Sequence, residues 1–287
     1  MTTPPELPGA VLATDDPARA ASALAAFENA SMTKFPDGPD IAPNFYELPC
    51  GLALPDGTVL DTAIVRELNG ADEEELARAT KSKNYSHFLQ TLLEKGVTKL
   101  GEEKITPKLL KDLSAGDRDF LVIAIRRATY GDTIEYEKLP CILCGEEADI
   151  SVHLGDDIKV TKLDPAKLTF TVPLSNNRSA TCRVPNGHDQ EELGKLPPPP
   201  TTTIPEYNSM MIKQCVIEIT DLATGRARSM AVQPGLAREL SMRDRKKIVD
   251  KLNNCQPGPQ YNDVRYTCPS CDQEVTLSVN VGAMFLV

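Results

Sequence analysis

Two Cys-x-x-Cys pairs, separated by a long stretch of chain, place the strongest constraint on how this sequence can fold. The first pair is Cys141 and Cys144, and the second is Cys268 and Cys271. Each cysteine of the second pair lies 127 positions after its counterpart in the first. Four thiolates complete the ligand set of a closed tetrahedral zinc site. The pattern therefore predicts that two distant turns, here called knuckles, meet around one Zn²⁺ bound by these four cysteines.

The spacing of the knuckles belongs to a longer internal repeat. Residues 66–76 match residues 183–193 at an offset of 117, and the Leu-Ser and Asp-Arg pairs of residues 113–118 return in residues 240–245 at an offset of 127. Between these blocks, Tyr85 and Tyr207 align at an offset of 122. The matches keep their order and the offset changes only in loops. We therefore expect an internally duplicated module in which each copy supplies one knuckle.

The predicted organisation is an N-terminal arm over residues 1–44, a first repeat over residues 45–155 and a second repeat over residues 156–287. The arm contains seven prolines, and its Asp16-Pro17 pair predicts the start of a short helix over residues 18–30. Two interpretations of the arm stay open, a disordered tail and a segment that orders on a partner. The apolar residues 284–287 are expected to be buried in the core or in a partner.

Each repeat is predicted to combine strands and helices, which makes the fold class α+β with a zinc-ribbon-like pair of knuckles. In the first repeat the patterns predict strands at 45–54, 58–68, 134–138 and 148–154, and helices at 72–81, 85–97, from 107, and from a Ser114-x-x-Asp117 capping box to Gly131. In the second repeat they predict a helix at 207–219, a helix from a Ser241-x-x-Asp244 capping box to Gly258, and a strand through Val275, Leu277, Val279 and Val281.

Charge and hydropathy limit the classes of partner. The net charge of the 287 residues is −10, whereas a protein that binds the phosphate backbone of nucleic acid needs clustered Lys and Arg. The densest basic cluster, residues 243–247, is interpreted as the solvated face of a helix. The sequence contains no secretory signal and no membrane-spanning stretch. It therefore predicts a cytoplasmic protein with reduced thiols, which favours metal binding over disulfides.

A shared Cys₄ zinc site is the favoured interpretation of the knuckles, and three alternatives stay open. These are relic knuckles without metal, two separate sites completed by other ligands, and redox chemistry, although neither pair opens a helix as redox motifs do. A closed Cys₄ site has no open position for water, and the sequence contains no catalytic triad or phosphate-binding loop, so no enzyme is predicted. The acidic runs 72–75 and 189–192 are interpreted as helix starts.

The remaining cysteines and the histidines have less specific predictions. Cys182, Cys215 and Cys255 align with Val65, Leu93 and Ala128, so each is expected to be a small core residue. Cys50 has no aligned partner and is expected to pack in the core or in a strand. The three histidines, His87, His153 and His188, are expected at the surface or its boundary. His153 is also considered as a spare metal ligand.

Two segments carry a resemblance to a known family. They are residues 119–126 followed by Thr129-Tyr130-Gly131, and residues 266–271 continued to Phe285. Over residues 44–287 the order of elements resembles the T-even-type baseplate proteins of contractile-tailed phages, including hub-associated and hub-assembly members, with relatives in phage-like contractile injection systems.

The resemblance implies a structural or assembly protein without catalytic residues. It would join the hub or spike to neighbouring wedge, baseplate or tape-measure proteins, first in the cytoplasm during assembly and then in the virion tail baseplate or injection-system particle. The alternative is a cytoplasmic zinc-ribbon adaptor that binds protein or nucleic acid, and the charge of −10 argues against nucleic acid.

Overall fold

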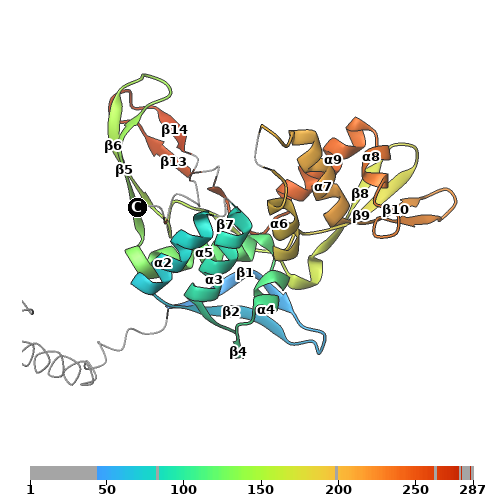
Figure 1. Cartoon of the computed structure of the whole chain (residues 1–287). Helices are drawn as coiled ribbons and strands as arrows, with labels where there is room; N and C mark the ends of the chain where they lie inside the picture. The colour runs from blue at the N-terminus through green and yellow to red at the C-terminus, as the bar shows by residue number, and fades with distance from the viewer. Residues whose placement is uncertain are drawn as a thin grey trace, which may run out of the picture. The chain divides into compact units, whose positions relative to one another are not determined.

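A computed structural model describes residues 44–81, 84–197, 200–261, 264–277, Val279 and Phe285 (Figure 1). The predicted helix at 18–30 and residues 280–284, 286 and 287 lie outside the described residues. The described residues combine helices and strands, which confirms the α+β prediction, and all belong to one compact unit, Pro43–Val287. Among them, no helix has the length and apolar character needed to cross a membrane.

The first half of this unit, residues 44–153, begins with a four-stranded antiparallel sheet. Its strands lie in the order β1 (Asn44–Ala53), β2 (Val59–Val65), β3 (Val97–Leu100) and β4 (Glu103–Lys104). Strands β3 and β4 were not predicted, and the helix predicted to reach residue 97 ends at Gly96. Val97 has extended backbone and pairs with Val65 of β2, so sheet pairing overrides the helical pattern there.

The first half has four helices: α2 (Gly70–Lys81), α3 (Tyr85–Gly96), α4 (Pro107–Asp112) and α5 (Ala115–Tyr130). Helices α3 and α5 contact the sheet, and α2 and α4 pack against α3. Thr106 caps α4 and Ser114 caps α5, and Gly131 ends α5 with a φ of 85°, as predicted. The helices and the sheet share an aliphatic core, whose most buried members include Leu92, Leu93, Leu100, Leu110, Leu121 and Ile125. This core holds α5 against β1 and β2.

The second half, residues 160–279, contains a sheet in the order β11 (Ala227–Ser229), β10 (Val216–Asp221), β9 (Arg178–Arg183) and β8 (Thr169–Leu174). Its helices are α6 (Gly187–Gly194), α7 (Ile204–Cys215), α8 (Leu236–Glu239) and α9 (Met242–Asn254). A separate core joins them, with Ala180, Cys182, Ile212, Ile248 and Leu252 almost fully buried. The short strands β7 (Val160–Thr161) and β12 (Gly258–Pro259) pair with each other, and η1 (Pro165–Lys167) precedes β8.

Two predicted boundaries of the second half are wrong. The helix predicted at 207–219 occupies Ile204–Cys215, because Val216 pairs with Cys182 and starts β10. Gly258 does not close α9, which ends at Asn254. Gly258 instead has a φ of 100° and lies against the backbone of Gly116. Its lack of a side chain therefore serves a close approach of two segments.

In each of the two predicted capping boxes, one of the two expected hydrogen bonds forms. Ser114 Oγ accepts from the N–H of Asp117 at 3.0 Å, as a cap should. The Asp117 carboxylate does not return to the cap backbone; it accepts from Cys50 N at 2.8 Å and Gly51 N at 3.2 Å. The start of α5 therefore holds the bulged end of β1.

The second capping box behaves in the same way. Ser241 Oγ accepts from the N–H of Asp244, and the Asp244 carboxylate accepts from both the N–H and the hydroxyl of Ser175 at 2.9 Å. Asp244 is fully buried, and Arg245 donates to Ala237 O at 2.6 Å. The prediction that residues 243–247 are simply a solvated face is therefore wrong for these two residues.

Two β-hairpins carry the knuckles. Strands β5 (Thr133–Pro140) and β6 (Glu147–His153) form the first, and β13 (Val264–Thr267) and β14 (Glu274–Leu277) form the second. They lie side by side in Figure 1 and share an apolar cluster with α5: Ile123, Ile150, Val152, Leu154, Ile158, Val264 and Val279. Phe285 is half-buried and packs against this cluster and against the core of the first half, so the predicted burial of the C-terminus is confirmed in part at this residue.

Candidate metal centre

The structure brings all four predicted ligand residues together. Cys141 and Cys144 lie in the turn between β5 and β6, and Cys268 and Cys271 lie in the turn between β13 and β14. Their four Sγ atoms all lie within 4.8 Å of one another. Sγ of Cys141 is 3.9 Å from that of Cys271, and Sγ of Cys144 is 3.8 Å from that of Cys268. The four cysteines can therefore hold one metal ion.

These separations match the geometry of a zinc site. Four sulfurs placed about 2.3 Å from a central Zn²⁺ at the corners of a tetrahedron lie about 3.8 Å apart. A disulfide would require a sulfur–sulfur distance of about 2.05 Å, so the four thiols are free. The donor set and its spacing therefore fit a thiophilic ion such as Zn²⁺.

Matching hydrogen bonds shape the two knuckles. The N–H of Cys141 donates to Glu146 O and that of Gly145 donates to Cys141 O, at 2.9 and 2.8 Å. In the second knuckle the N–H of Cys268 donates to Gln273 O and that of Asp272 to Cys268 O, both at 2.9 Å.

Both turns require left-handed backbone after the second cysteine. The φ angles are 79° at Gly145 and 56° at Asp272. Glycine adopts it without a steric penalty, and aspartate tolerates it better than most residues. This turn aims both sulfurs of each knuckle to the same side.

Backbone donors prepare the sulfurs for a positive ion. The N–H of Leu143 donates to Cys141 Sγ at 3.4 Å. The N–H groups of Cys271 and Ser270 lower the pKa of the Cys268 thiol to about 7, whereas burial and the neighbouring thiols raise the pKa of the Cys271 thiol to about 12. Because the thiolate is the form that binds metal, Cys268 is the ligand that this turn prepares near neutral pH.

One side of the cluster is closed and the other is open. Cys141 and Cys268 are buried against Val275 and Tyr266, whereas Cys144 is exposed. An ion therefore has a path to the sulfurs from solvent. Within the described ranges, no other group of three or more Cys, His, Asp or Glu side chains gathers closely enough to hold a metal.

The other cysteines and the histidines lie apart from this cluster. Burial raises the pKa of the Cys50, Cys182 and Cys215 thiols to about 12, so they are unreactive core residues, as predicted. Cys255 is half-buried at the end of α9. His153 is exposed and its Nδ1 lies 3.2 Å from Thr133 Oγ1, on the part of β6 far from the knuckle.

The acidic runs lie at helix starts, as predicted, but one carboxylate in each run is buried in an ion pair that was not predicted. Arg66 contacts both oxygens of Asp72 at 2.8 and 2.9 Å, and its hydrogen bond lowers the pKa of Asp72. Arg183 contacts both oxygens of Asp189 in the same way. The signal in the sequence that could have predicted these ion pairs is an arginine six positions before an aspartate, which both repeats contain.

The comparison of this chain with known protein families gives a match. The family model described as T4 bacteriophage base plate protein matches residues 53–280, a span that contains both knuckles, the whole second sheet and strands β2–β4 of the first. No curated protein and no solved structure matches the chain.

Proposed function

The chain belongs to the T4 bacteriophage base plate protein family, and we propose that it links the hub or spike of a contractile tail to neighbouring proteins. The observation that carries this proposal is the family match over residues 53–280. Membership supports a structural role in the tail baseplate and contacts with other baseplate proteins. Wedge or tape-measure proteins as direct neighbours, and a place in a phage-like injection particle, are finer parts of the proposal.

The four knuckle cysteines are proposed to share one structural Zn²⁺. The sulfur separations of 3.8 and 3.9 Å and the matching turns support a shared site over two separate ones. A closed Cys₄ site leaves no coordination position for substrate or water. We therefore propose that the metal joins the hairpins β5–β6 and β13–β14 and that the protein is not an enzyme.

The two halves are proposed to be copies of one module. In the first sheet Val65 pairs with Val97 and Ala63 with Leu100. In the second sheet, Cys182 pairs with Val216 and Ala180 with Ile219, which is the same register. Apart from β7, η1 and β12, which are extra in the second half, the order of strands and helices is also the same in both halves.

The Asp-Arg pairs support the duplication at the level of side chains. Asp117 and Asp244 both accept from the end of the first strand of their own sheet. Arg118 donates to Leu110 O and Arg245 to Ala237 O, each eight positions earlier in the chain and each at 2.6 Å. Unrelated modules have no reason to share such detail.

The structure corrects one part of the sequence alignment. Helix α3 ends at Gly96 and α7 ends at Cys215, an offset of 119, so the alignment of Tyr85 with Tyr207 at 122 is wrong. Cys215 therefore corresponds to Gly96 and not to Leu93. The proposed organisation remains an arm over residues 1–44 and two repeats over residues 45–155 and 156–287.

Two experiments test these proposals. Mass spectrometry of purified contractile particles and of their assembly intermediates should detect this chain, and cross-linking should identify its neighbours. Absence from both would contradict the baseplate role. Elemental analysis of the freshly purified chain should find about one zinc per chain. Two ions, or none, would contradict the shared site and leave the family assignment in place.

A further inference from the structure

The two halves meet at a joint in which α6 packs against α3, α4 and α5. The first residues of α6 pair with the segment between α4 and α5. Pro185 O accepts from Ala115 N at 2.9 Å, and the N–H of Gly187 donates to Leu113 O at 3.2 Å. A Cβ on Gly187 would lie only 2.8 Å from Cα of Lys111, so the approach requires glycine.

Polar side chains complete this joint. Arg118 Nε donates to Gln190 Oε1 at 2.7 Å, and Ser86 Oγ donates to Gln190 O at 2.6 Å. Lys111 forms an ion pair with Glu191 at 2.8 Å. The docking element is therefore the start of α6, and the receiving surface is built by the helices of the first half.

The first half carries a counterpart of this docking element. At the offset of 117, the start of α2 places Gly70, Glu73 and Glu74 where α6 has Gly187, Gln190 and Glu191. Both glutamates are exposed. Among the described residues, a Cβ on Gly70 would meet nothing within 4 Å, in contrast to one on Gly187. In this part of the chain the outer face of the start of α2 is exposed, and Glu74 forms a surface ion pair with Arg78 there.

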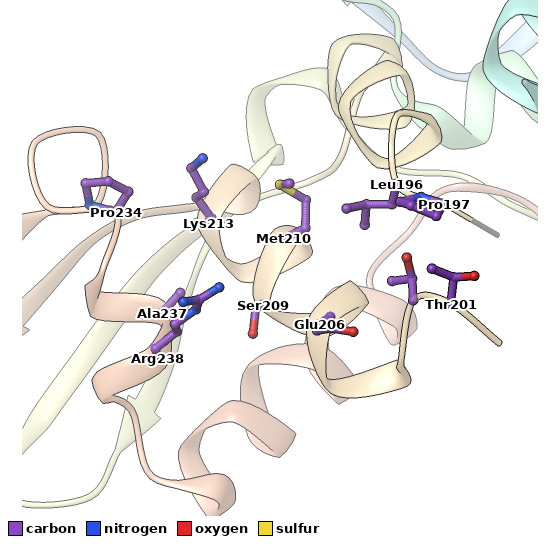
Figure 2. Close-up of a pocket in the computed structure, with 11 residues that line it drawn as sticks. Leu196, Pro197, Thr201, Glu206, Ser209, Met210, Lys213, Pro234, Ala237 and Arg238 are labelled. Carbon is purple, nitrogen blue, oxygen red and sulfur yellow. The ribbon is translucent and has the colours of Figure 1, made fainter. Parts of the chain in front are cut away.

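The second half carries a counterpart of the receiving surface, here called the α7–α8 groove. Arg238 and Arg245 stand where Lys111 and Arg118 stand in the first half, at the offset of 127. A pocket of about 370 Å³ lies in the groove. Figure 2 shows Met210 and Lys213 of α7 beside this pocket, with Arg238 of α8 across it.

Exposure distinguishes the used surface from the unused one. Ala115, which pairs with Pro185 at the joint, is 4% exposed, whereas its counterpart Met242, the first residue of α9, is 89% exposed. Among the described residues, neither Arg238 nor Lys213 has a carboxylate within ion-pair distance. Glu206 also lines the pocket, and its carboxylate interacts electrostatically with Arg238, so the groove carries two basic side chains, one acidic side chain and several apolar ones.

Charge complementarity indicates what fits this groove. If the start of α2 lay in the groove as α6 lies at the joint, Glu74 would face Arg238 and Glu73 would face Arg245. The first of these pairs repeats the Lys111–Glu191 ion pair with the same signs. The second replaces the Arg118–Gln190 hydrogen bond with an ion pair of opposite charges.

We propose that the start of α2 in one copy of this chain docks in the α7–α8 groove of a second copy. The contact repeats between chains the joint that exists within each chain. The two surfaces differ, so the interface is heterologous and successive copies can continue into a ring or an open row. This proposal rests on the duplication proposed above and is independent of the neighbours proposed in the baseplate.

Sedimentation analysis of the full chain over a range of concentrations tests the interface. The wild-type chain should self-associate, and Glu74→Arg and Arg238→Glu should each weaken association about tenfold or more, equivalent to about 1.4 kcal/mol. A mixture of these two variants should associate like the wild type, because every interface in an alternating row then joins opposite charges. The matched control is Glu102→Arg on the β3–β4 turn, where the side chain is 99% exposed, and it should associate normally.

Gly70→Ala tests the geometry separately from the charge. The added Cβ has open space in the free chain, so folding and zinc content should be unchanged, whereas association should fall about tenfold or more. A wild-type chain that stays monomeric, a variant mixture that does not recover, or a Gly70→Ala chain that associates normally would each overturn the proposal. Zinc content and thermal unfolding of the same samples would then show whether the shared site and the fold still stand.

Discussion

At the scale of single residues, the cysteines divide into proposed ligands and core residues, and substitution should separate the two classes. Cys268→Ser removes one of four ligands from a site whose metal binding contributes about 10 kcal/mol or more. Cys215→Ala removes one buried sulfur from a separate core, which should cost about 1–3 kcal/mol. We expect a far larger fall in thermal stability and a loss of zinc only for Cys268→Ser. Thermal unfolding and elemental analysis would measure both, and equal effects would contradict the ligand assignment.

The buried carboxylates of the Asp-Arg pairs give a second residue-level prediction. Asp117 accepts two backbone N–H groups of β1 and the Ser114 hydroxyl, and all of these partners are buried. In Asp117→Asn the amide group would turn one acceptor into a donor, leaving a buried N–H without a partner at a cost of about 1–3 kcal/mol. Asp244→Asn should have a similar effect in the second half. Chemical denaturation would measure both, and an unchanged midpoint for either would contradict the proposed common role.

At the scale of elements, the sequence predicted most helices and both hairpins but missed the strands that follow α3 and α7. Gly96 stands just before Val97 and was an available signal for the end of α3, whereas Cys215 and Val216 continue the apolar pattern of α7 without a Gly or Pro, so no local signal marks the change to strand there. Pairing with Val65 and Cys182 decides the structure there. The meeting of the knuckles was predictable for the opposite reason, since the equal offset of all four cysteines reports a relation between distant elements.

The contact between α5 and β12 is a feature that no local pattern could predict, and it can be tested. A Cβ on Gly116 would overlap the backbone carbonyl of Pro257. Gly116→Ala should therefore push β12 away from α5 and lower the free energy of unfolding by about 1–3 kcal/mol, the usual cost of overpacking. Gly235→Ala is the matched control, because a Cβ there meets nothing within 4 Å. Equal stability of the two variants would show that the close approach is unimportant.

At the scale of the whole molecule, two apolar cores and the proposed metal centre stabilise different parts of the chain. Each half has its own apolar core, whereas the hairpins β5–β6 and β13–β14 share a small cluster with α5. A two-stranded hairpin is at best marginally stable by itself. The four-residue strands of β13–β14 therefore depend on this cluster and, as proposed, on the metal.

Removal of the metal should accordingly make the hairpins β5–β6 and β13–β14 more flexible and leave the rest of the fold unchanged. A strong chelator should release about one zinc per chain. Amide hydrogen exchange should then rise in β5, β6, β13 and β14, while α5 and α9 stay protected by contacts with the two large cores. Added Zn²⁺ should restore the original protection, and Cys215→Ala should respond like the wild type. Global unfolding on chelation would show that the two halves cannot fold without the metal. Unchanged exchange in the hairpins would show that the knuckles are held by packing, and the proposed role of the zinc would be wrong.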